Sequence, residues 1–141
     1  MTSTQSEIRA FLDSRSEAIS TGDLDRLMSF YSPDIVYFDI VPPLQYVGSA
    51  ALRERFSHWF DGFEGPIGQV HDLSIVTSGD VAVASMLIRA SGTRKIGDEV
   101  GFWVRATSSF QRSDNGWLIT HEHVSLPVDL ARGSAVTNLA P

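Results

Sequence analysis

The sequence has no cysteine among its 141 residues, which excludes disulfide bonds and thiolate metal sites and suits a reducing compartment. It also has no cluster of basic residues, and its net charge is −6 at pH 7, so neither nucleic acid nor an anionic membrane is an expected partner. Apolar runs stay well short of the roughly twenty residues that cross a bilayer, and the polar first residues do not resemble a secretory signal. We therefore expect a cytoplasmic protein, and the length fits a single domain.

The first half of the chain shows helical periodicity. Apolar residues recur every three or four positions over three segments: 5–20, 23–31 and 49–61. Tyr31 is expected to face the core from the end of the second helix. A short strand is predicted at 35–40 and ends before Pro42 and Pro43, which cannot donate hydrogen bonds to a sheet.

The second half of the chain has the pattern of strands. Turn sequences separate four segments: 67–78, 80–94, 99–113 and 115–126. Helices followed by such strands predict an α+β domain, with the N-terminal helices packed on one face of a curved antiparallel sheet. The predicted core spans about 5–127, and 128–141 is an irregular C-terminal tail.

The predicted strand at 99–113 is apolar on both sides, with Trp103 on the face away from the helices. A second apolar face on a sheet needs a cover, and we expect it to be a second copy of the chain in a homodimer. The alternative is that the predicted strand at 80–94 lies centrally in the sheet and that the C-terminal tail covers its outer face.

The last predicted strand carries an unusual set of polar side chains. Alternate residues of a strand share a face, so one face is predicted to hold Trp117, Ile119, His121, His123 and Ser125. Two imidazoles and a hydroxyl together favour the polar wall of a pocket over a plain core. The His-x-His spacing also occurs at zinc sites, but no third ligand stands at a recognisable spacing, so no metal is expected.

Four segments together resemble a known superfamily: Gly22-Asp-Leu-Asp25, Phe30-Tyr-Ser-Pro-Asp34-Ile-Val-Tyr-Phe-Asp39, Tyr46-Val-Gly48 and Gly116-Trp117-Leu-Ile-Thr-His121-Glu-His123-Val-Ser125-Leu-Pro127. They look like the nuclear transport factor 2-like superfamily, in particular its SnoaL-like and ketosteroid-isomerase-like branch. The last segment also resembles the association domain of calcium/calmodulin-dependent kinase II. The resemblance implies a cone in which three helices pack across a bent sheet and enclose a pocket. It does not imply one activity, because this fold hosts isomerases, dehydratases, cyclases, epoxide hydrolases and assembly domains.

The resemblance to ketosteroid isomerase places Asp39 where that enzyme keeps its proton-shuttling carboxylate. Arg15 falls at the position of its helix-borne tyrosine donor, and Ser108 at that of its protonated aspartate donor. An arginine and a hydroxyl do not reproduce that pair of acidic donors, so steroid isomerisation is not expected. A carboxylate base acting on another compound remains consistent with the sequence.

Each candidate residue also has a structural explanation. For Asp39 it is binding to nearby backbone donors, and for Arg15, on the apolar stripe of its helix, it is pairing with Asp34 or Asp39. The aromatic residues Phe56 and Trp59 suit either the core or the wall of a pocket.

Three classes of function therefore remain open. The first is a cofactor-independent isomerase, dehydratase or cyclase that acts on a small apolar carbonyl compound, with Asp39 or His123 as the base. Its oxygen-binding groups would be Arg15, His121 and Ser108, with Ser125 on the same wall. The second is a module that binds a small apolar or weakly acidic molecule without chemistry. The third is a homo-oligomeric assembly domain.

Overall fold

The computed structural model describes residues 3–141 and has three helices at the start of the chain. They are α1 (Ser3–Thr21), α2 (Leu24–Met28) and α3 (Ser49–Gly62). The strands are β1 (Tyr31–Phe38), β2 (Tyr46–Val47), β3 (Phe63–Ser78), β4 (Val81–Arg94), β5 (Glu99–Ser113), β6 (Gly116–Ser125), β7 (Val128–Asp129) and β8 (Ser134–Ala135). None of the helices in residues 3–141 is long and apolar enough to cross a membrane.

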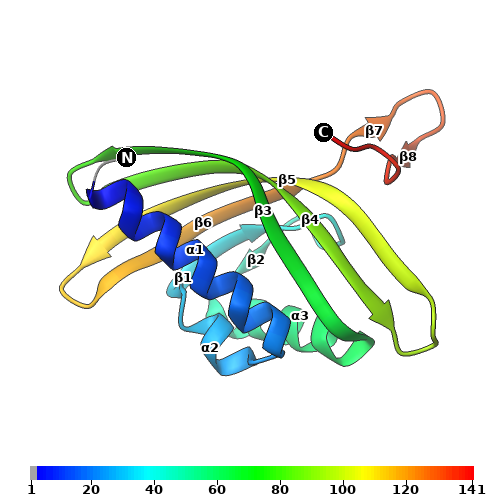
Figure 1. Cartoon of the computed structure of the whole chain (residues 1–141), viewed down its shortest axis with the longest axis horizontal. Helices are drawn as coiled ribbons and strands as arrows, with labels where there is room; N and C mark the ends of the chain where they lie inside the picture. The colour runs from blue at the N-terminus through cyan, green and yellow to red at the C-terminus, as the bar shows by residue number, and fades with distance from the viewer. Residues whose placement is uncertain (1–2) are drawn as a thin grey trace.

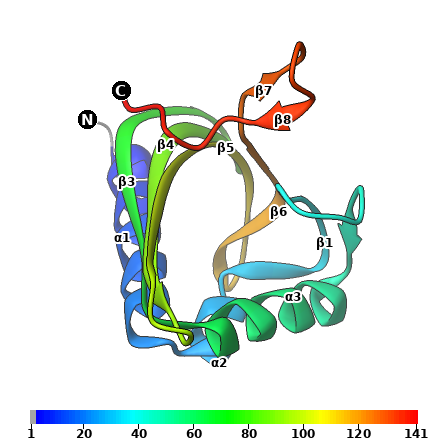
Figure 2. The same ribbon diagram turned by 90° about the vertical axis from the view of Figure 1, so that its right-hand side faces the viewer.

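Six strands form one strongly curved sheet in the order β2-β1-β6-β5-β4-β3 (Figure 1). Viewed end-on, the sheet arches over an interior that α3 closes from below, while α1 runs along one side (Figure 2). The α+β class and the cone shape expected from the sequence are confirmed. The sheet is mixed rather than wholly antiparallel, because β1 runs parallel to β6.

Two local expectations are wrong. Tyr31 does not end the second helix but opens β1, because α2 stops at Met28 and Ser32 precedes Pro33, a position that favours extended backbone. The tail is not wholly irregular, since β7 and β8 pair as a short hairpin that projects from the body (Figure 2).

The core lies between α1, α3 and the concave face of the sheet. One face of α1 buries Ile8, Leu12, Arg15 and Ala18, at the three- and four-residue spacing of a helix. An arginine in this series is unusual, because a buried guanidinium needs a partner of opposite charge. The partner comes from β6.

An irregularity in β6 decides which of its side chains reach the interior. Ser109 of β5 pairs with His121 and the next residue, Phe110, pairs with Ile119, so Thr120 is an extra residue at a bulge. The alternation of side chains shifts there: Ile119 is fully buried, and the next buried side chain is Glu122, which is 3% exposed. Glu122 therefore faces inward, whereas His121 and His123 lie on the outer face of the sheet.

Candidate ligand pocket

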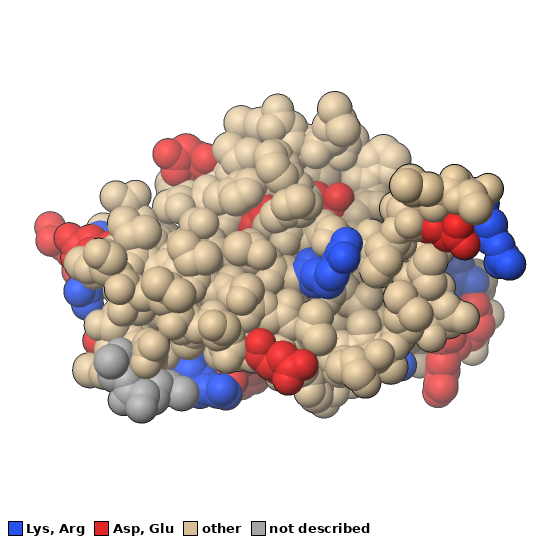
Figure 3. Space-filling view, turned by 90° about the horizontal axis from the view of Figure 1, so that it is seen from above, with Lys and Arg blue, Asp and Glu red and all other residues tan. Residues whose placement is uncertain are grey.

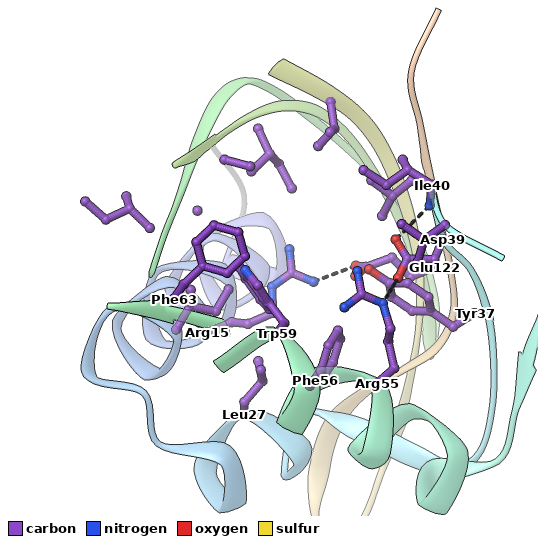
Figure 4. A pocket seen from close by; sticks show the side chains of 18 of the residues that line it. Arg15, Leu27, Tyr37, Asp39, Ile40, Arg55, Phe56, Trp59, Phe63 and Glu122 are labelled. Atoms are coloured by element: carbon purple, nitrogen blue, oxygen red, sulfur yellow. Dashed lines mark hydrogen bonds and ion pairs between the residues drawn. The ribbon is translucent and has the colours of Figure 1, made fainter. Parts of the chain in front are cut away.

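The interior of the cone contains a cavity of about 400 Å³ between α1, α3 and the concave face of the sheet. Most of its wall is apolar and includes Phe56, Trp59, Phe63, Ile88 and Phe102. Its polar side chains gather toward one side, where Tyr37, Asp39 and Glu122 lie opposite Phe63 (Figure 4). A cavity of this size, largely apolar with a few converging polar groups, is typical of small-molecule sites.

A buried ion pair forms part of the polar side. Nη1 of Arg15 lies 2.5 Å from Oε2 of Glu122, and both side chains are less than 5% exposed. The same nitrogen donates to the Tyr31 hydroxyl at 3.3 Å, which in turn donates to Oε1 of Glu122 at 3.1 Å. Ser108 donates a further hydrogen bond to Oε2 of Glu122. Glu122 is thus satisfied by three side chains, as a buried carboxylate requires.

Two groups on this side keep donors free for a ligand. Nε and Nη2 of Arg15 make no hydrogen bond with any residue in 3–141. The Tyr37 hydroxyl likewise has no hydrogen-bond partner in that part of the chain, although Tyr37 is 6% exposed and lines the cavity. Donors in an apolar cavity without protein partners are suited to hold a ligand oxygen.

Asp39 follows the end of β1, two residues after Tyr37, and its carboxylate borders the same cavity. Oδ2 accepts from Nε of Arg55 on α3 at 2.7 Å, and Oδ1 accepts from the backbone nitrogen of Ile40 at 2.7 Å. The Asp39 side chain is 7% exposed and that of Arg55 is 22% exposed. The aspartate is therefore an oriented carboxylate at the edge of an apolar space.

Burial alone would lower the pKa of the Arg15 guanidinium, but the negative charge of Glu122 outweighs it and Tyr31 adds to the rise, so this pKa lies above its usual value. Burial, followed by the charge of Glu122, raises the pKa of the Tyr31 hydroxyl above its usual range. The pKa of Tyr37 is raised by the same two causes, in the same order. Both tyrosines are therefore neutral hydrogen-bond donors at physiological pH.

These shifts predict how stability depends on pH. A tyrosine whose pKa is raised by folding contributes stability that is fully present below the unfolded pKa of about 10 and is lost as the pH rises further. In a Tyr46→Phe variant, only Tyr31 and Tyr37 can give the tyrosinate absorbance at 295 nm. We expect that signal to appear together with the loss of circular dichroism. Tyrosinate formation near pH 10 in an intact fold would contradict the burial of these hydroxyls.

The structure brings together four of the residues that the sequence singled out. Arg15, Asp39, Phe56 and Trp59 all line the cavity, and their functional roles stay predictions. Ser108 is fully buried behind the wall of the pocket. Its hydrogen bond to Glu122 links it to a residue that lines the cavity.

The two histidines and Ser125 are placed differently from the expectation. His121 Nδ1 lies 2.8 Å from the carbonyl oxygen of Val36, and both imidazoles pack edge-on against Phe38. Ser125 accepts from Nε of the exposed Arg105 at 3.1 Å. The predicted cavity shared by Asp39 and the histidines is therefore wrong, because the bulge at Thr120 reverses the alternation that the prediction assumed.

Sequence reasoning missed six polar residues that line the pocket: Tyr31, Tyr37, Arg55, His58, Ser91 and Glu122. For two of these residues, the periodicity of the sequence does indicate that they face the pocket. Tyr37 shares a face with Asp39 by the two-residue period of a strand, and Arg55 is four residues before Trp59 on one helical face. The sequence also suggested Asp34 or Asp39 as the partner of Arg15, whereas the structure pairs Arg15 with Glu122.

The curved sheet, the helices across it and the pocket between them define the nuclear transport factor 2-like class of fold. Residues 8–129 match the family model of the SnoaL-like domain, and the chain belongs to that family. A search of curated protein sequences finds no match.

Solved structures with this fold are similar over most of the chain. A nuclear transport factor 2-like protein of unknown function from Pseudomonas putida is 26% identical, with a TM-score of 0.87 and 100% of both chains covered. A putative aromatic ring hydroxylase from Novosphingobium aromaticivorans is 22% identical, with a TM-score of 0.77 and coverage of 84% of this chain and 85% of that one. A putative dehydratase from Streptomyces avermitilis is 18% identical, with a TM-score of 0.76 and coverage of 85% and 93%.

Proposed function

We propose that this protein binds a small, largely apolar carbonyl compound and transfers a proton on it without a cofactor. The observation that carries the proposal is the position of the Asp39 carboxylate and the free Tyr37 hydroxyl, two residues apart on one wall of an apolar cavity. The names of the similar putative dehydratase and hydroxylase agree with chemistry on small molecules.

The proposed step uses one base and one or two donors. Asp39 takes the proton from the carbon next to the carbonyl group, and the electron pair of that bond moves onto the carbonyl oxygen to form an enolate. Hydrogen bonds from Tyr37 and from the free nitrogens of Arg15 stabilise the charge on this oxygen. In a substrate with a conjugated carbon–carbon double bond, return of the proton from Asp39 to the far carbon gives an isomer. In a substrate with a hydroxyl group on the neighbouring carbon, the enolate expels this group, which takes the proton from Asp39 and leaves as water.

Proton abstraction can be measured before the natural substrate is known. We expect the protein in D₂O to accelerate exchange of the protons next to the carbonyl group of 2-tetralone, a neutral bicyclic ketone, as followed by proton NMR. The exchange reports the first step whatever product the natural substrate gives. Binding of the ketone with an exchange rate equal to that of buffer would contradict the catalytic part of the proposal.

The ion pair between Asp39 and Arg55 favours a second candidate, a module that binds its ligand without chemistry. Each oxygen of this carboxylate already accepts a hydrogen bond, one from the backbone nitrogen of Ile40 and one from Arg55. Ligand binding without exchange would support this candidate.

We further propose that the outer face of the sheet joins two copies of the chain. Figure 3 shows this face with few charged side chains over its central part, although 20% of all residues are charged. Trp103 lies on it, with the His71 ring 4.8 Å away, and exposed valines such as Val83 lie on the neighbouring strand. A face with few charges and with exposed apolar side chains is suited to burial against a second copy.

For the dimer, light scattering at micromolar concentration should give twice the 15.5 kDa mass of one chain. Trp103→Glu should give the single-chain mass, because a two-fold axis would bury two added charges in one interface. Leu44→Glu is the matched control, since Leu44 is 95% exposed in the segment between β1 and β2. A wild-type monomer would remove this proposal.

A further inference from the structure

The charged residues of the pocket occur in two balanced pairs. Among the residues that line the cavity, the cations are Arg15 and Arg55, and the anions are Glu122 and Asp39. Each cation touches one anion, at 2.5 Å for Arg15 and Glu122 and at 2.7 Å for Arg55 and Asp39. His58 also borders the cavity, but it is exposed, so solvent and salt screen its charge. The wall therefore offers the free donors of Arg15 and Tyr37, while its two ion pairs carry no net charge.

We infer that the ligand of this pocket is uncharged, and that the two ion pairs impose this selectivity. A charged ligand group must leave water, and the protein compensates that loss only with an opposite charge that is not already neutralised. Both arginines are neutralised by their own partners, so a ligand carboxylate gains little here. A neutral carbonyl or hydroxyl oxygen needs only a hydrogen-bond donor, which the free nitrogens of Arg15 and the Tyr37 hydroxyl supply. This inference rests on the proposed ligand-binding function and narrows it to one class of ligand.

The distribution of polar and apolar residues around the cavity indicates the shape of such a ligand. The free donors and both ion pairs lie toward one side of the cavity, where Figure 4 shows Tyr37, Asp39 and Glu122. The apolar part of the wall includes Phe63, Ile88 and Phe102. A compound with one polar end and an apolar ring system matches this division. A volume of about 400 Å³ accommodates two or three fused rings.

The charge selectivity can be tested with probes that share one ring system. Calorimetric titration would compare 2-acetylnaphthalene, which is neutral, with 2-naphthoate, an anion, and 2-naphthylmethylammonium, a cation. We expect the wild-type protein to bind the ketone at least tenfold more tightly than either ion. Wild-type protein that binds 2-naphthoate as tightly as the ketone would overturn the inference and leave the ligand-binding function standing. Failure of all three probes to bind would count against both.

Substitutions that unbalance one pair should change the preferred charge. Asp39→Asn leaves Arg55 unpaired, so 2-naphthoate should bind at least tenfold more tightly than it binds wild type, with the ketone changed less than threefold. Arg55→Gln leaves Asp39 unpaired and should instead strengthen binding of the ammonium probe. The double variant, Asp39→Asn with Arg55→Gln, removes both charges of this pair. The cavity wall is then neutral again, and we expect the selectivity of the wild-type protein to return.

The matched control is Asp34→Asn, which removes the same charge from an exposed position on β1 outside the cavity. It should leave all affinities unchanged. Thermal melting shows whether each variant folds, and the two single variants shift charge in opposite directions, so either one alone tests the inference. Unchanged selectivity in a folded single variant would show that the ion pairs do not set the ligand's charge.

Discussion

Replacing Glu122 by leucine is expected to cost about 3–5 kcal/mol of unfolding free energy, because it leaves the Arg15 guanidinium buried without a counter-charge. A domain of this size is stable by about 5–15 kcal/mol, so the variant loses a large share of its stability. The same substitution removes the acceptor for Tyr31 and Ser108. Urea unfolding followed by circular dichroism would measure the difference.

Two control variants separate the buried charge from the loss of a side chain. Glu17→Gln breaks an exposed ion pair with Arg26 and should cost less than about 1 kcal/mol. The double variant Arg15→Met with Glu122→Leu removes both charges and should recover at least half of the stability lost in the single variant. A Glu122→Leu protein as stable as Glu17→Gln would show that this pair does not hold the pocket wall in place.

Asp39→Asn is expected to slow the exchange of protons next to the carbonyl group of 2-tetralone by about 100- to 10,000-fold, the range that a positioned general base contributes. Asparagine keeps the size of the side chain but accepts a proton very poorly. Binding of the neutral ketone should change little, because the wall and its donors stay in place. Proton NMR in D₂O gives the rate, and calorimetry gives the affinity.

Tyr37→Phe complements that experiment, because it removes a donor to the developing oxyanion and not the base. We expect it to lower the exchange rate by about 100-fold or more while the cavity keeps its shape. Asp34→Asn again serves as the control for a carboxylate outside the cavity. An Asp39→Asn protein that exchanges protons at the wild-type rate would assign the base to another residue.

The elements of the fold were largely readable from the sequence because their signals are local. Helical periodicity located α1 and α3, and the turn residues between the long strands located β3 to β6 within a few positions. The start of β1 was missed because the apolar spacing around Tyr31 suits a helix as well as a strand. The parallel pairing of β1 with β6 was missed because it joins segments about 85 residues apart, and no local signal encodes such pairing.

The sequence by itself determined that Arg15, on a buried helical face, needs an anionic partner, and that Asp39 stands at the end of a short strand, which the structure places directly before it. Only the tertiary structure decided that the partner is Glu122 and that the histidines beside it face outward. The physical reason is the bulge at Thr120: one extra residue reverses which side of the strand each later side chain takes. That extra residue is defined by the pairing of β6 with β5. It therefore exists only once the sheet has formed.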